Sequence, residues 1–183
     1  MARAGGAGGA RVAVWDRPVR LLHWLLAAAA VACWLTSSRW HDWAGYLAGA
    51  AALARIAWGF GPSRHARFAS FLRGPRATVR YAAQLTAGRE PHYLGHNPLG
   101  AWMVVVLLAV VLALGITGWL YVNTDAFWGD PVMERIHVVL GWTLLGLVAV
   151  HVAAVAWMGW RHRENLVRGM LDGRKAAVRA DGG

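Results

Sequence analysis

Cysteine, charged residues in general and acidic residues in particular are scarce in this 183-residue chain, and each scarcity excludes some classes of protein. It has one cysteine, Cys33, so it forms no internal disulfide, and without a CxxCH motif it lacks the usual attachment for a covalent c-type haem. Charged residues make up only 15% of the chain, below the roughly 25% of soluble domains. Acidic residues number 9 against 19 Lys and Arg. The basic residues stand in blocks between apolar runs, which predicts a membrane protein and no nucleic-acid partner.

The two ends of the chain lack apolar runs. Residues 1–14 are rich in Gly, Ala and Arg and have no stretch typical of a signal peptide. Residues 174–183 have the same character. We therefore expect flexible cytoplasmic tails at 1–14 and 174–183, flanking one transmembrane domain over residues 15–173.

Four apolar stretches are long enough to cross a bilayer, which takes roughly 20 residues. They are Val19–Ser37, Trp43–Phe60, Leu99–Tyr121 and Met133–Trp160. Asp16 can cap the first helix, and Pro18 suits its first turn. The sequence therefore predicts an all-α fold, an integral membrane four-helix bundle in contact with membrane lipid.

The basic residues predict the orientation of these spans. Nearly all of the 19 lie in the two tails or in the connection between the second and third spans. The exceptions are Arg39 and Arg135 in the other loops and Arg55 inside the second span. By the positive-inside rule, both termini and the long connection are cytoplasmic.

The long connection contains the stretch GPRATVRYAAQL, in which Arg alternates with Val, Tyr and Leu. Pro75 suits the first turn of a helix. We expect a short interfacial helix between the second and third spans, lying on the membrane surface. A solvated helix is the alternative.

Two histidines, His137 and His151, lie in the fourth span. Fourteen residues separate them, so they share a helix face to within roughly 40° and stand about 21 Å apart along the axis. One metal cannot reach both, and each needs its own partner. His23, early in the first span, is level with His151, and His41, at the start of the second span, is level with His137.

Two His–His pairs suit haem iron held from both sides, whereas zinc takes four ligands, often with Cys or acidic members. Each histidine alone could equally be a packing or proton-relay residue. The matching depths of all four favour two haem sites.

Small residues follow the histidines at one-turn spacing. Gly45 follows His41 and Gly141 follows His137, four residues on. A flat macrocycle needs such small neighbours, but close helix packing needs them too. Gly45 and Gly49 form a GxxxG pattern that would also allow a homodimer.

Three arginines are candidate partners for haem propionates. Arg39 and Arg135 each precede an outer histidine by two residues, and Arg20 precedes His23 by three. These positions bring each guanidinium near a predicted haem site.

Two further residues are candidates for a quinone or propionate site. Arg55 projects from the same face as His41, fourteen residues on, and would meet the inner propionate or a quinone headgroup, unless it snorkels to the interface. His96, just before the third span, could exchange a proton with a quinone. The alternative for His96 is an interfacial residue at the helix start formed by Asn97 and Pro98.

Four stretches resemble the prokaryotic cytochrome b561 family, and within it the small members related to the cytochrome b subunit of nickel–iron hydrogenases. They are VWDRPVRLLHW, WHDWAGYLAGAAALARIAWGFGPSRHARF, GHNPLGAWM and IHVVLGWTLLGLVAVH, within Val12–Gly173. The resemblance implies a multi-pass protein of the bacterial inner membrane with two b-type haems, whose ligands would be the four histidines above.

Iron with histidine on both sides passes electrons rather than binding substrate. The first hypothesis is therefore electron transfer between the membrane quinone pool and a periplasmic cytochrome c or dehydrogenase. A second is a superoxide oxidase that reduces quinone, which the acidic outer loops disfavour because they would repel the anion. A third is a non-redox membrane protein whose histidines handle protons or a metal. The sequence thus leaves open whether the protein is an enzyme or an electron-transfer subunit.

Overall fold

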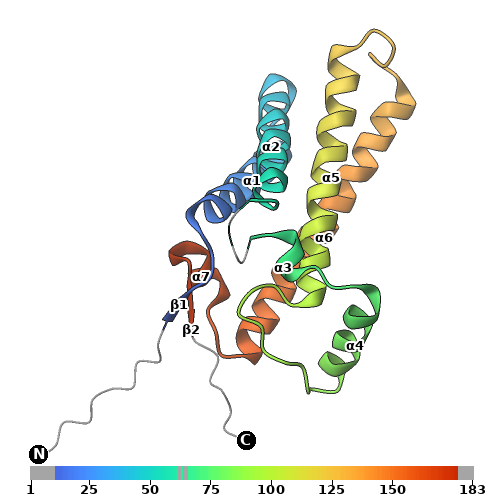
Figure 1. Ribbon diagram of the computed structural model, residues 1–183. Coiled ribbons are helices and arrows are strands. Elements are labelled where there is room, and N and C mark those ends of the chain that lie inside the picture. Colours follow the sequence, from blue (N-terminus) through green and yellow to red (C-terminus); the bar gives the residue numbers. More distant parts are fainter. Residues whose placement is uncertain (1–10, 62, 64–65, 177–183) are drawn as a thin grey trace, which may run out of the picture.

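The computed structural model describes residues 11–61, 63 and 66–176, and its described part is mostly helical (Figure 1). The long helices are α1 (Arg17–Leu35), α2 (Ser38–Trp58), α5 (Pro98–Asn123) and α6 (Pro131–Arg161). Shorter elements are β1 (Arg11–Ala13), α3 (Phe68–Phe71), α4 (Pro75–Thr86), α7 (Leu166–Asp172) and β2 (Arg174–Ala176).

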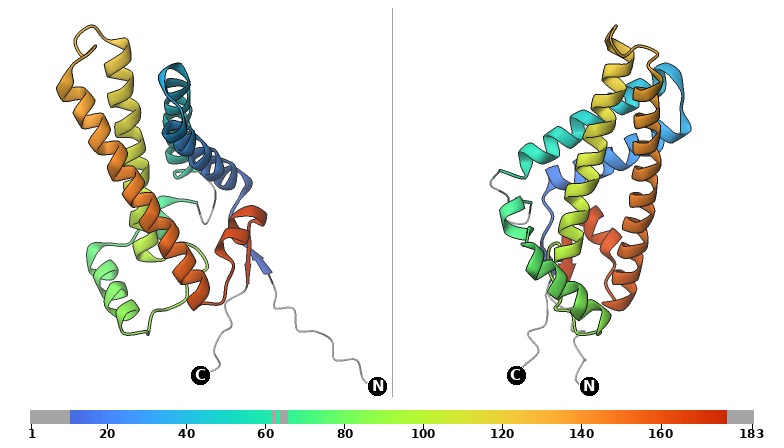
Figure 2. Two further views of the ribbon diagram at one scale, coloured as in Figure 1. Left: turned by 180° about the vertical axis from the view of Figure 1, so that it is seen from behind. Right: turned by 90° about the vertical axis from the view of Figure 1, so that its right-hand side faces the viewer.

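The long helices form two antiparallel hairpins, α1 with α2 and α5 with α6 (Figures 1 and 2). The hairpins meet where α2 packs against α5. The connection between α1 and α2 is only Thr36 and Ser37, and Ser38 takes a positive φ of 52° to make this tight turn. This arrangement leaves α1 and α2 on one side and α6 on the other.

Three of the long helices begin in the same way. Asp16, Asn97 and Asp130 each accept a hydrogen bond on the side-chain oxygen from the first turn of α1, α5 and α6 respectively. A proline lies in the first turn of each, where its missing N–H is not needed. These residues fix where each helix starts.

Three helices, α1, α5 and α6, are long and apolar enough to cross a membrane. Only 11%, 11% and 6% of their apolar windows are buried within the described structure, so most of their side chains face outwards. Apolar surface on this scale fits lipid and not water. The chain is a membrane protein in contact with lipid. The fourth long helix, α2, is not among the three, and it carries the charged residues Arg39, Asp42 and Arg55, which lower its mean hydropathy.

The segments at the two ends of the described chain pair with each other, although we expected both to belong to flexible tails. Arg11–Ala13 and Arg174–Ala176 form an antiparallel two-stranded sheet. Gly173 makes the turn into β2 with a φ of 78°, and a Cβ there would lie 2.5 Å from the carbonyl oxygen of Trp15. Such long-range pairing leaves no local pattern in a segment of Gly, Ala and Arg. The rest of both predicted tails, 1–10 and 177–183, lies outside the described residues.

The helix expected between the second and third spans is present as α4. Tyr81 is buried, whereas Arg76 and Arg80 are exposed. Its position at a membrane surface stays a prediction.

Asp16 joins the start of α1 to the end of α2, because its other carboxylate oxygen accepts a hydrogen bond from Trp58 Nε1 at 3.0 Å. We expect Asp16→Ala to lower the free energy of unfolding by about 1–2 kcal/mol, since it removes a helix cap and leaves the Trp58 indole without its partner. Thermal unfolding in detergent measures this change. Asp125→Ala, an exposed loop change, is the control. Equal stability of both variants would contradict the role of Asp16.

Candidate functional site

The four predicted histidines come together in two pairs. His41 on α2 faces His137 on α6, with ring centroids 6.0 Å apart and an angle of 69° between the rings. His23 on α1 faces His151 on α6, with centroids 6.4 Å apart and an angle of 56°. We call His41 and His137 the outer pair, since it lies farther from β1 and β2, and His23 and His151 the inner pair. Every ring is partly buried.

These distances fit one metal between the imidazoles of each pair. A metal–imidazole nitrogen bond measures about 2 Å and the nitrogen lies about 1 Å from the ring centre, so two imidazoles facing one metal have centroids about 6 Å apart. No hydrogen bond joins the rings of either pair in the described structure. The described residues also hold no group of three or more His, Cys, Asp or Glu that could take a metal. Two ligands per site suit haem iron and not a four-ligand zinc site.

The helix packing leaves room at both pairs. The helices α1 and α2 pack closely against each other, as do α2 and α5, and α5 and α6. The histidines instead span α1 to α6 and α2 to α6, which approach less closely. A Cβ placed on Gly45 or Gly141 would meet no atom within 4 Å, so open space lies beside the outer pair. A Cβ on Gly49 would likewise meet no atom within 4 Å, whereas a Cβ on Gly115 of α5 would lie 3.7 Å from the Cα of Gly49.

Both outer imidazoles are oriented by hydrogen bonds from Nδ1. His41 Nδ1 donates to the carbonyl oxygen of Cys33 at 2.9 Å, and His137 Nδ1 lies 2.9 Å from Thr117 Oγ1 on α5. This arrangement leaves Nε2 of each ring as the free ligand atom. Sequence reasoning missed Thr117, although it is the only residue with an aliphatic hydroxyl in the predicted third span.

Among the predicted arginines, only Arg55 is buried. Its side chain is 5% exposed, with Nη2 3.4 Å from the carbonyl oxygen of Ala66 and the guanidinium 5.6 Å from the centre of the Phe68 ring. Nη1 has no partner among the described residues.

The other three predicted arginines are not buried. Arg20 donates from Nη1 to the carbonyl oxygen of Leu171, so it fastens α7 to α1. Arg39 and Arg135 are exposed at the start of α2 and of α6. Their pairing with haem propionates stays a prediction.

His96 lies between two aromatic rings at the base of α5. Its ring centroid is 4.7 Å from those of Trp15 and Phe71, and Nδ1 is buried without a partner in the described structure. Burial, helped by the charges of Arg55 and Lys175, lowers the pKa of His96 to about 3. The imidazole is therefore neutral at physiological pH. Asn97, and not His96, caps α5.

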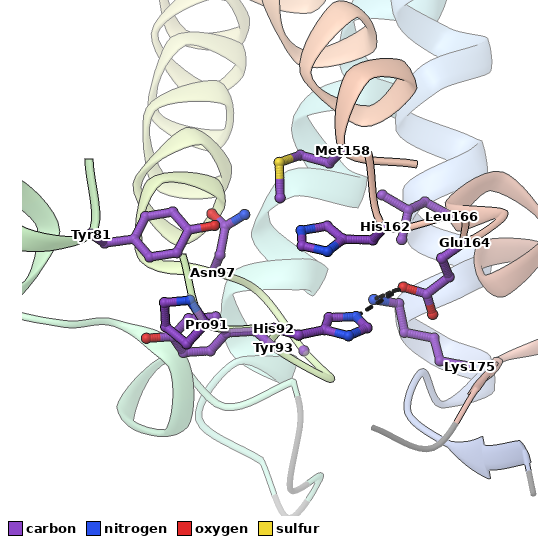
Figure 3. Close-up of a pocket in the computed structure, with 11 residues that line it drawn as sticks. Tyr81, Pro91, His92, Tyr93, Asn97, Met158, His162, Glu164, Leu166 and Lys175 are labelled. Atoms are coloured by element: carbon purple, nitrogen blue, oxygen red, sulfur yellow. Dashed lines mark hydrogen bonds and ion pairs between the residues drawn. The ribbon is translucent and has the colours of Figure 1, made fainter. Parts of the chain in front are cut away.

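A polar pocket opens beside His96, where the segment before α5 meets the end of α6 (Figure 3). His92 and His162 stack with centroids 4.8 Å apart, and Glu164 lies 3.4 Å from both His92 Nε2 and Lys175 Nζ. The Tyr81 hydroxyl is buried there without a hydrogen-bond partner among the described residues.

Glu90 and Arg161 brace this region. Arg161 donates from Nε to Oε1 of Glu90 and from Nη2 to Oε2 of Glu90, and the distance from Nη2 to Oε2 is 3.1 Å. The hydrogen bonds from Arg161 hold the pKa of Glu90 below its ordinary value. The pair ties the end of α6 to the segment that leads into α5.

Apolar helices with facing imidazole pairs define a membrane protein that can hold metal between histidines. A model of the prokaryotic cytochrome b561 family matches residues 14–173, and the chain belongs to this family. Membership implies haem b binding and haem-based electron transfer across a membrane. Neither a comparison with curated proteins nor one with solved structures finds a match.

The lowered pKa of His96 predicts a pH dependence of stability. The unfolded chain binds a proton below about pH 6.5 that the folded chain takes up only near pH 3, so stability falls as pH falls below 6.5, by up to about 1.4 kcal/mol per pH unit. His96→Gln should flatten this slope between pH 7 and 5, as measured by tryptophan fluorescence during thermal unfolding. His96→Phe, which also cannot titrate, should match it. An unchanged slope in both variants would show that His96 does not carry the effect.

Proposed function

We propose that the chain passes electrons across a membrane through two b-type haems, one held by His41 and His137 and the other by His23 and His151. The observation that carries this proposal is the 6.0 and 6.4 Å spacing of the two imidazole pairs. Haem iron with both axial positions filled supplies reversible one-electron transfer without a substrate site. Family membership supports the same chemistry.

In this proposal α1, α2, α5 and α6 form a four-helix transmembrane bundle. The close packing of α2 between α1 and α5 supports α2 as the fourth span despite its charged residues. Lipid would tolerate those residues because Arg39 and Asp42 lie at the helix start and Arg55 is buried. The pairing of β1 with β2 supports two termini on one side, and the positive-inside rule makes that side the cytoplasm of a bacterial inner membrane.

The helix α6 contributes one imidazole to each pair. His137 and His151 stand about 21 Å apart along it, so the two sites lie at different depths. The outer pair would exchange electrons with a periplasmic cytochrome c or dehydrogenase, and the inner pair with membrane quinone.

The quinone headgroup would bind near Arg55 and His96. Both side chains present a buried nitrogen without a partner in the described structure, Nη1 of Arg55 and Nδ1 of His96. A quinone carbonyl could accept a hydrogen bond from Arg55, and the neutral His96 imidazole could donate or accept a hydrogen bond at Nδ1.

Removing one histidine of either pair should remove one haem and leave the other. We expect about two haems per chain in the unaltered protein and about one in His137→Ala and in His151→Ala, because each loses one of two axial ligands. Haem released per chain, quantified from its absorbance, measures this. His92→Ala, a histidine outside both pairs, should keep two. A protein without haem, isolated from haem-supplied cells, would contradict the proposal and favour proton or metal handling.

The proposed quinone site is tested separately by Arg55→Gln. We expect at least tenfold slower haem reduction by a short-chain quinol, because the carbonyl loses a charged hydrogen-bond donor. Reduction by dithionite and the haem content should stay unchanged. Arg76→Gln, which removes an exposed arginine from α4, is the control. Equal quinol rates in all three proteins would place the quinone elsewhere.

A further inference from the structure

The two imidazole pairs differ in their hydrogen bonding. Both outer rings have a partner at Nδ1, the Cys33 carbonyl for His41 and the Thr117 hydroxyl for His137. Neither His23 nor His151 has such a partner among the described residues; the nearest ring to His23 besides His151 is Trp24, edge-on at 5.3 Å. This difference in hydrogen bonding changes how strongly the imidazoles of each pair would donate electrons to a bound iron.

The direction of the bond between Thr117 and His137 follows from the other contacts of the hydroxyl. Thr117 Oγ1 lies 2.8 Å from the carbonyl oxygen of Ala113 and 3.2 Å from that of Leu114. A hydroxyl has one proton, and it donates that proton to a carbonyl that can only accept. Thr117 Oγ1 therefore accepts from Nδ1–H of His137, which leaves the lone pair of Nε2 free to bind a metal.

The next residue on α5, Gly118, fixes the position of the same ring. A Cβ on Gly118 would lie 3.1 Å from Cε1 of His137, which is closer than most Cβ contacts, and 3.6 Å from its Nδ1, an ordinary van der Waals distance. The helix backbone thus lies directly against the imidazole. We call Thr117 and Gly118 the α5 seat of His137.

We propose that the α5 seat makes the outer site the lower-potential one of the two, so that electrons run from the outer pair to the inner pair. A hydrogen bond donated by Nδ1–H moves electron density towards Nε2 and makes the imidazole a stronger donor to iron. A stronger donor favours the oxidised metal and lowers the reduction potential. Both outer imidazoles have this bond, and the inner ones have none to the residues that the structure describes. This inference rests on the proposed function.

Spectroelectrochemical titration of the purified haem protein tests the proposal. The unaltered protein should show two transitions, and His137→Ala should lose the lower one. In Thr117→Val, which removes the hydroxyl at nearly constant volume, the lower transition should move upward and the upper one should stay. At a fixed applied potential, the ratio of reduced to oxidised outer haem should rise by up to about tenfold. For a one-electron couple this corresponds to a rise of about 59 mV in its midpoint potential.

Two variants make the result specific. Thr117→Ser keeps the hydroxyl and should restore the parent potential. Thr143→Val removes a hydroxyl from α6 whose only hydrogen bond within the described part of the chain is to the Val139 carbonyl, and should leave both transitions unchanged. If Thr117→Val instead loses the outer haem while Thr117→Ser retains it, the hydroxyl holds His137 in place, and the comparison of the unaltered protein with His137→Ala decides the order of potentials.

The proposal is overturned if the unaltered protein has two transitions and His137→Ala loses the upper one, or if Thr117→Val moves neither transition. Both results leave the proposed function intact. A protein that binds no haem, or one haem, would refute the proposed function itself, and haem content is measured before any titration.

Discussion

An imidazole in a lipid-facing helix needs a polar or metal partner, and the arrangement of the other helices depends on this requirement. His137 and His151 lie on one face of α6, and each faces a histidine from the other hairpin. The two hairpins must therefore be held close enough for imidazoles to meet and far enough for a metal to fit between them. Packing of α2 against α5 sets that separation, with Gly115 against Gly49 at the point of contact.

The starts of α1 and α6 set the depths of the histidines that these helices carry. Asp16, Asn97 and Asp130 cap α1, α5 and α6, and proline fixes the first turn of each. His137 therefore lies near the start of α6 and His151 far along it. The end where β1, β2 and α7 meet gathers Arg55, His96 and a polar pocket, whereas the opposite end has exposed Arg39 and Arg135. The molecule thus has two chemically different ends.

The sequence was sufficient to predict the long helices and the pairing of all four histidines, because helical rise and the order of spans determine depth. It was not sufficient for contacts made across long distances in the chain. The pairing of β1 with β2, the bond from Arg20 to the Leu171 carbonyl, and the stacking of His92 on His162 have no local pattern. The same holds for Thr117. A hydroxyl in an apolar span indicates that a hydrogen bond is made, but the sequence does not identify the residue that makes it. That partner bears on the direction of electron flow, which composition and spacing left open.

The central claim is that each imidazole pair holds an iron atom between its two rings. An experimental structure of the haem-loaded protein, with iron located by its anomalous scattering, tests it most directly. The account predicts two iron atoms per chain, one between Nε2 of His41 and of His137 and one between Nε2 of His23 and of His151. Iron bound elsewhere, or four histidines without iron between them in a protein that contains haem, would contradict it.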